Sequence, residues 1–202
     1  MIITPSLISL IVSFYIYDLS DLYKFNWLDT LTTKGYLNIL NIHAGFDETS
    51  ALIKNKFPAS YLQVFDFYDS MRHTEVSIKR ARKAYPPYPN TKQINTSHIP
   101  LDENFADLIF VTLSAHEIRD EKERNAFFAD MSRVLKPSGN IIVTEHMRDI
   151  RNFAAYNIGF FHFMPRRAWL NNFKAANLNI SNEKQITPFI TTFILSKNGT
   201  AS

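Results

Sequence analysis

The chain has 202 residues, the size of one compact domain. Its apolar share of 46% and charged share of 20% exclude a disordered or fibrous protein, and its net charge of +3 is too small to indicate nucleic acid binding by itself. Because there is no cysteine, disulfides, thiolate zinc sites, iron–sulfur clusters and a cysteine nucleophile are all excluded.

The chain begins with an apolar stretch over residues 2–17, IITPSLISLIVSFYIY. It is shorter than the ~20 residues that span a bilayer, and no basic residue precedes it, so a secretory signal and a transmembrane span are not expected. Serines at near-helical spacing leave Leu7, Ile11 and Phe14 on the opposite side. We expect lead-in helices within residues 1–36, the first of them buried or half-buried, in a cytoplasmic protein. Weak association of this helix with a membrane surface is the alternative.

From residue 37 to residue 202 we expect a single globular unit in which short apolar runs alternate with helical patterns. Strands are predicted over residues 37–42, 61–67, 91–96, 106–113, 140–144, 177–183 and 190–196, and helices over 47–56, 72–85, 120–135 and 166–176. Repeated strand–helix units need crossover connections, so this order predicts an α/β fold with a doubly wound, mostly parallel, seven-stranded sheet. Only residues 184–188 join the last two strands, which is too short for a crossover and predicts an antiparallel final strand.

The most specific phrases of the chain lie in residues 106–146, ADLIFVTLSAHEIRDEKERNAFFADMSRVLKPSGNIIVTEH. Together with HIPLD at 98–102, this stretch resembles the corresponding segment of class I S-adenosylmethionine-dependent methyltransferases. With the upstream strands the similarity covers roughly residues 37–196. The resemblance implies a Rossmann-like methyltransferase fold and S-adenosyl-L-methionine as cofactor. Small-molecule methyltransferases of the ubiquinone and menaquinone biosynthesis type are the nearest relatives expected.

The family's cofactor turn, an acidic residue two positions before G-x-G-x-G, falls on residues 41–47, NIHAGFD. Only the middle glycine is present, and such glycines permit positive φ and close approach of the ligand. The resemblance implies that the cofactor-binding residues here are Asn41, His43, Gly45 and Asp47. Cofactor binding therefore requires that the side chains of His43 and Asp47 leave room in the turn.

Further cofactor contacts are implied at the ends of later strands. Asp66 stands where the family has an acid that accepts hydrogen bonds from the ribose, and Asp69 is a rival for this role. Thr96 and Ser97 match the positions that contact the adenine, and Leu113 lies at the underside of the cofactor.

Asp47 and Glu48 open the predicted helix after the first strand. Dinucleotide-binding and P-loop proteins present a helix N-terminus to phosphate, which two carboxylates would repel. S-adenosylmethionine has no phosphate and carries two cationic groups, so the two carboxylates disfavour binding of NAD and ATP more strongly than binding of S-adenosylmethionine. The alternative is that Asp47 is simply an N-cap and Glu48 a first-turn acid.

Polar residues follow the fourth and fifth predicted strands, at the edge where such sheets bind ligands. They are Ser114, His116 and Glu117 after the fourth strand, and Glu145 and His146 after the fifth. Because histidine titrates near neutral pH, His116 and His146 are candidate catalytic bases, although each alone is more often a packing or hydrogen-bonding residue. The H-E-x-x-H spacing fails after His116-Glu117, and no metal site is expected.

Two further segments have alternative interpretations. The aromatic-rich residues 148–165 are predicted either to line an acceptor pocket or to pack the last helix against the sheet. The basic run over residues 79–83 is interpreted as a solvated helix surface rather than an RNA-facing patch, so no nucleic acid partner is expected. The sequence thus predicts an S-adenosylmethionine-dependent methyltransferase acting on an unidentified small molecule. The alternative is a methyltransferase-like module that has lost catalysis and binds a partner.

Overall fold

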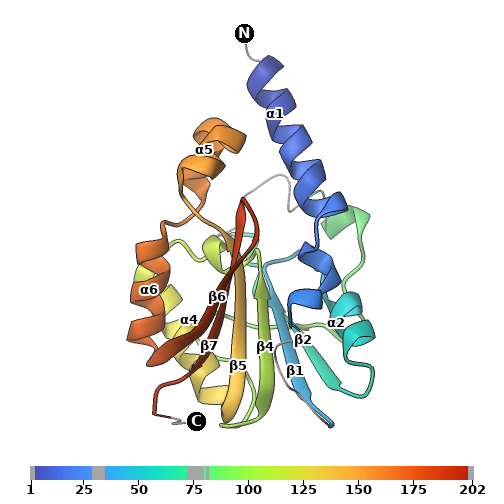
Figure 1. Ribbon diagram of the computed structural model, residues 1–202. Coiled ribbons are helices and arrows are strands. Elements are labelled where there is room, and N and C mark those ends of the chain that lie inside the picture. Colours follow the sequence, from blue (N-terminus) through green and yellow to red (C-terminus); the bar gives the residue numbers. More distant parts are fainter. Residues whose placement is uncertain (1–2, 29–34, 72–79, 81, 200–202) are drawn as a thin grey trace.

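The computed structural model describes residues 3–28, 35–71, 80 and 82–199, and the description below concerns these residues. A seven-stranded sheet of order β3-β2-β1-β4-β5-β7-β6 forms the centre of the protein (Figure 1). Its strands are β1 (Asn38–His43), β2 (Tyr61–Asp66), β3 (Lys92–Gln93), β4 (Ala106–Thr112), β5 (Leu135–His146), β6 (Leu178–Thr187) and β7 (Ile190–Lys197). Strands β1 to β5 pair in parallel, whereas β7 lies antiparallel between β5 and β6. The predicted fold, including its antiparallel final strand, is confirmed.

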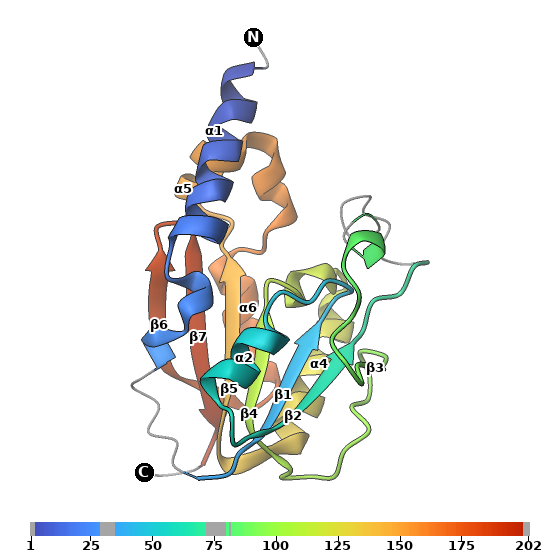
Figure 2. The ribbon, with the colours of Figure 1, turned by 90° about the vertical axis from the view of Figure 1, so that its right-hand side faces the viewer.

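Helices cover both faces of the sheet (Figure 2). The longer ones are α1 (Ile3–Phe14), α2 (Ser50–Lys56), α4 (Glu121–Val134), α5 (Ile150–Tyr156) and α6 (Arg166–Ala175). Short helical turns are η1 (Tyr15–Leu19), η2 (Leu22–Lys24), η3 (Asn26–Leu28), η4 (Ala115–Glu117) and η5 (Asn157–His162). Helices α4 and α6 pack on one face, while α2 and residues 25–28 pack on the other. Strands between two such layers are buried on both sides, which explains their continuous apolar runs.

Helix α4 shows how closely local sequence sets an element. The side chain of Asp120 accepts a hydrogen bond from the backbone N–H of Glu123 at 2.8 Å and so begins the helix. Its apolar stripe, Phe127, Phe128, Met131 and Val134, is fully buried against the sheet.

Several predicted boundaries are wrong. Strand β5 begins at Leu135, five residues before the predicted start, because Leu135 pairs with Ala106 of β4. Gly139 also lies against β4, where a Cβ atom at this position would be 2.8 Å from the Asp107 carbonyl oxygen. Helix α2 begins at Ser50 instead of Asp47, and β3 keeps only two of the six residues predicted. The predicted helix over residues 72–85 lies largely outside the described residues. Within that range the structure describes residues 80 and 82–85, and residues 80 and 82–84 are helical.

The prediction that the first helix is buried or half-buried is also wrong. Helix α1 projects beyond the carboxyl edge of the parallel strands beside α5 (Figures 1 and 2), and Leu10, Ile11 and Phe14 are 69%, 59% and 56% exposed. By length and composition the helical segment Thr4–Leu28 is long and apolar enough to cross a membrane, contrary to the expectation from residues 2–17. Only 11% of its most apolar 18 residues are buried. This criterion is weak alone, because core helices and signal sequences also meet it. From Ile16 onward the chain turns back into the core, where Leu22 and Trp27 are buried.

Candidate cofactor and acceptor site

The ends of β1 and β2 meet at the carboxyl edge of the sheet. The two strands pair in parallel register, with His43 opposite Asp66. The turn after β1 therefore lies next to the end of β2. This register brings together the residues of the two predicted cofactor motifs, which are 25 positions apart when counted from Asn41 to Asp66.

The turn between β1 and α2 is held by Asp47. Its Oδ1 atom accepts hydrogen bonds from the backbone N–H groups of Thr49 at 3.0 Å and Ser50 at 2.9 Å. The expected N-cap role of Asp47 and first-turn position of Glu48 are nevertheless wrong, because Thr49 is the N-cap of α2 and its first turn contains no acid. The Asn41 amide donates to the hydroxyls of the same two residues at 2.9 and 2.8 Å, and to Asp47 Oδ1 at 3.3 Å. Asn41 and Asp47 thus fix the start of α2.

Three polar atoms of this turn are buried without a hydrogen-bond partner among the described residues: Asn41 Oδ1, His43 Nε2 and Asp47 Oδ2. The Nδ1 atom of His43 accepts a hydrogen bond from the Gly45 N–H at 3.2 Å, so Nε2 carries the proton of the neutral ring. Burial lowers the pKa of His43, which keeps the ring neutral. Buried polar atoms are nearly always bonded, so these three are unusual. Two of them, His43 Nε2 and Asp47 Oδ2, lie 4.0 Å apart, which is too long for a hydrogen bond.

The carboxylate of Asp66 is buried and already has partners. Its Oδ1 accepts from the Tyr68 N–H at 2.8 Å, and its Oδ2 accepts from Arg82 Nη1 at 2.5 Å. Arg82 also donates to the Gly45 carbonyl oxygen at 3.0 Å, and its guanidinium lies 4.6 Å from the centre of the Tyr68 ring. His43 Nδ1 is 3.8 Å from Asp66 Oδ1. Arg82 and His43 therefore both lie against the Asp66 carboxylate, and in this conformation His43 does not leave the room that cofactor binding requires.

The role of Arg82 was missed because the basic run of residues 79–83 was interpreted as a solvated surface. Its side chain is indeed 37% exposed, yet its tip reaches back to the turn. No spacing motif signals this contact, because it depends on the path of the chain after β2.

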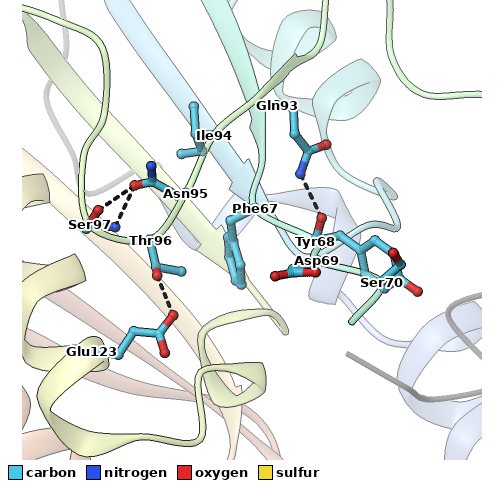
Figure 3. A pocket seen from close by; sticks show the side chains of 10 residues that line it. All are labelled: Phe67, Tyr68, Asp69, Ser70, Gln93, Ile94, Asn95, Thr96, Ser97 and Glu123. Carbon is cyan, nitrogen blue, oxygen red and sulfur yellow. Dashed lines mark hydrogen bonds between the residues drawn. The ribbon is translucent and has the colours of Figure 1, made fainter. Parts of the chain in front are cut away.

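Two cavities lie near the ends of β1 and β2. The larger, 730 Å³, is lined by Phe67, Asp69, Thr96, Ser97 and Glu123, among others (Figure 3). Thr96 and Ser97, the predicted adenine contacts, thus line an open cavity, and Thr96 Oγ1 donates to Glu123 Oε1 at 2.5 Å. The rival acid Asp69 lines it too.

The smaller cavity, 130 Å³, lies on the other side of the β1 turn. Its lining includes His43, Leu113, Ser114 and Glu117, so the predicted underside residue Leu113 is placed next to the turn. Asp66 lines neither cavity.

His116 belongs to a cluster of ionisable side chains. Its Nδ1 is 2.7 Å from Glu145 Oε2, and its Nε2 is 3.3 Å from Glu117 Oε1. His162 Nε2 is also 3.3 Å from that Glu117 oxygen. Burial alone lowers the pKa of His116, but the two carboxylates outweigh it and raise this pKa to about 10. At neutral pH the imidazole is protonated, a state that cannot accept a proton.

His146 has the opposite electrostatic setting. Burial lowers its pKa to about 4, so the ring is neutral at neutral pH. Its Nδ1 is 3.0 Å from Asn152 Oδ1, its Nε2 accepts from the Tyr17 hydroxyl at 3.1 Å, and the ring stacks on Phe163 at 4.4 Å between centres. Both nitrogens are engaged, and the catalytic roles of His116 and His146 stay predictions.

The aromatic segment 148–165 forms α5 and η5, and its rings contact one another. Ring centres of Phe153 and Phe160 are 5.0 Å apart, and those of Tyr156 and Phe163 are 5.5 Å apart. Helix α5 packs beside α1. Neither of the two cavities described above is lined by these rings.

Known proteins share both the sequence pattern and the fold. A family model described as a methyltransferase domain matches residues 53–143. A ubiquinone/menaquinone biosynthesis C-methyltransferase of Edwardsiella ictaluri is 33% identical over 79 residues, which are 38% of this chain and 30% of that protein. The chain thus matches less than a third of that relative's length.

Solved structures match over nearly the whole chain. An S-adenosylmethionine-dependent methyltransferase of Aquifex aeolicus superposes with a TM-score of 0.61 at 16% identity, covering 95% of this chain and 97% of that one. S-adenosylmethionine-dependent methyltransferases of Methanosarcina mazei give 0.62 at 14% identity, covering 84% and 96%. At such identity these likenesses establish the fold. The fold is thus that of S-adenosylmethionine-dependent methyltransferases, and the family model adds a sequence match to a methyltransferase domain over residues 53–143.

Proposed function

We propose that the protein is an S-adenosylmethionine-dependent methyltransferase that acts on a small molecule. The observation that carries this proposal is the set of three buried, unpartnered polar atoms in the β1 turn. Asn41 Oδ1 and Asp47 Oδ2 are acceptors suited to the ammonium group of the cofactor, and the Nε2–H of His43 is a donor suited to its carboxylate. The turn has lost two glycines, but the side chains that replaced them offer matching polar atoms.

The two cavities fit the other parts of the cofactor. The 730 Å³ cavity is within the usual size range of ligand sites, roughly 300–1,000 Å³, and would hold the adenine between Thr96, Ser97 and Phe67. The ribose position at Asp66 opens only when Arg82 leaves and the His43 ring, 3.8 Å from Asp66 Oδ1, turns aside. Because the Arg82 side chain is 37% exposed, it has solvent on one side into which it can turn.

When bound, S-adenosylmethionine supplies an electrophilic methyl group, and the chain's part is to align the acceptor with it. A base is needed only for an acceptor that must lose a proton. Of the two predicted bases, only His146 is neutral at neutral pH, and the proton would reach it through the Tyr17 hydroxyl. The Tyr17 ring stacks near Tyr23, whose hydroxyl donates to Glu48 of the smaller cavity.

We also propose that the exposed apolar side of α1 rests on a membrane surface, with exposed Ile150 and Ile158 of the α5–η5 segment beside it. These two side chains are 76% and 78% exposed, and α1 carries no charged residue. Exposed apolar patches of this kind mark membrane or protein contacts. A cytoplasmic location and the absence of a nucleic acid partner stay predictions.

Calorimetric titration with S-adenosylmethionine and S-adenosylhomocysteine tests the cofactor assignment. We expect micromolar binding that disappears in Asp66→Ala and persists in Asp102→Ala, a control that removes an exposed carboxylate. Absence of binding of both ligands to the wild type and to Arg82→Gln would overturn the proposal and leave the non-catalytic module.

A further inference from the structure

His116, Glu117 and His162 direct their ligand atoms at one another, and the three atoms lie within 4.8 Å of one another. We propose that these three residues bind a divalent first-row transition-metal ion, with Zn²⁺ favoured. The site does not depend on methyl transfer. The sequence could not indicate it, because His162 comes from η5, 45 positions after Glu117.

The separations fit zinc coordination. Tetrahedral zinc holds nitrogen and oxygen ligands at ~2.0–2.2 Å, which places neighbouring ligand atoms roughly 3.3 Å apart. Both imidazole Nε2 atoms are 3.3 Å from Glu117 Oε1. Only the third separation has to close, and the His162 side chain, 32% exposed, has room to turn.

The surrounding residues hold the ligands in place. Glu145 accepts a hydrogen bond from Nδ1 of His116, which leaves Nε2 as the ligand atom, an arrangement common behind metal-bound histidines. Nη1 of Arg119 donates to the backbone carbonyls of both His116, at 3.1 Å, and His162, at 2.6 Å. One guanidinium thus ties together the two chain segments that carry the histidines.

Charge and ligand type favour a divalent transition metal. Glu145 is fully buried and Glu117 is 9% exposed, and without a metal the protonated His116 compensates only one of their two negative charges. A divalent ion would replace the Nε2 proton of His116, which is released to solvent, and would compensate both charges. Two imidazoles and one carboxylate suit Zn²⁺, whereas Mg²⁺ and Ca²⁺ prefer oxygen ligands alone. Glu117 also lines the 130 Å³ cavity, so a molecule there lies within reach of the ion's remaining coordination position.

Zinc titration of the EDTA-treated full chain, by calorimetry and metal analysis after dialysis, tests the site. We expect one equivalent of Zn²⁺ to bind and Mg²⁺ not to compete. Glu145→Gln should weaken binding about 10- to 100-fold, as for other residues behind metal-bound histidines, and His162→Gln at least as much. The matched control is His98→Gln, which removes a histidine that is 63% exposed.

Two results would overturn the proposal. One is a wild type that binds no stoichiometric Zn²⁺, and the other is a folded His162→Gln variant that binds it as tightly as His98→Gln. Should His162→Gln not fold, the visible spectrum of the Co²⁺-loaded wild type decides. An intense four-coordinate spectrum supports the site, and a weak octahedral spectrum contradicts it.

Discussion

The Arg82–Asp66 ion pair predicts that removing Arg82 strengthens cofactor binding. Under the proposed function the cofactor ribose would compete with Arg82 for the same Asp66 oxygen, to which Arg82 Nη1 donates at 2.5 Å. A hydrogen bond to a charged group contributes about 1.5–3 kcal/mol, and partial solvent exposure of Arg82 reduces this to about 1–2 kcal/mol. Binding must first break this contact, so Arg82→Gln should lower the Kd for S-adenosylhomocysteine by about 5- to 30-fold.

Isothermal titration of the wild type and Arg82→Gln at equal ionic strength measures this change. Arg80→Gln is the matched control, because it removes an exposed arginine from the same segment and should leave the Kd unchanged. A thermal melt shows whether each variant is folded. A folded Arg82→Gln variant with unchanged or weaker binding would refute the competition between Arg82 and the ribose.

Three other expectations follow from single residues. His146 has a pKa near 4 in the folded protein and near 6.5 in the unfolded chain, so it contributes stability that is complete above pH 6.5 and is lost as the pH falls towards 4. In urea unfolding at several pH values, the His146→Gln variant should therefore lose less free energy of unfolding over this range than the wild type. An equal loss in both proteins contradicts the assignment. Phe14→Glu should abolish flotation of the protein with phospholipid vesicles without changing its melting temperature, whereas a wild type that does not float with vesicles excludes the membrane contact. Gly45→Ala should destabilise the protein by about 1–3 kcal/mol, because φ is +91° and the new Cβ would lie 2.8 Å from the Tyr68 ring. Gly35→Ala shares the positive φ but has nothing described within 4 Å, so an equal loss in both variants would show that the Tyr68 contact is unimportant.

The sequence by itself determined the architecture, because strand burial and helix amphipathicity leave periodic patterns along the chain. The continuous apolar run at residues 106–113 predicted a strand covered on both faces, which β4 is. The short link at 184–188 predicted the antiparallel end, and Asp120 predicted the start of α4 to the residue. Each of these features leaves a signal within a few residues of the sequence, so it can be predicted without knowledge of the distant contacts.

Boundaries failed where a distant partner outweighs local signals. The turn-like residues 136–139 belong to β5 because the residues on either side of them, Leu135 and Asn140, pair with Ala106 and Leu108 of β4. Helix α1 has the composition of a core helix, yet it lies beyond the edge of the sheet, where few described residues can cover it. Composition does not reveal whether a covering surface exists.

Only the tertiary structure decided which polar side chains meet. The acid at the end of β2 was recognisable, but its pairing with Arg82 was not, since that contact depends on how the chain returns to the β1 turn. His116 and His162 share the oxygen of Glu117 because the segments after β4 and β5 converge at one edge of the sheet. Such contacts link residues far apart in the chain, and no local periodicity encodes them.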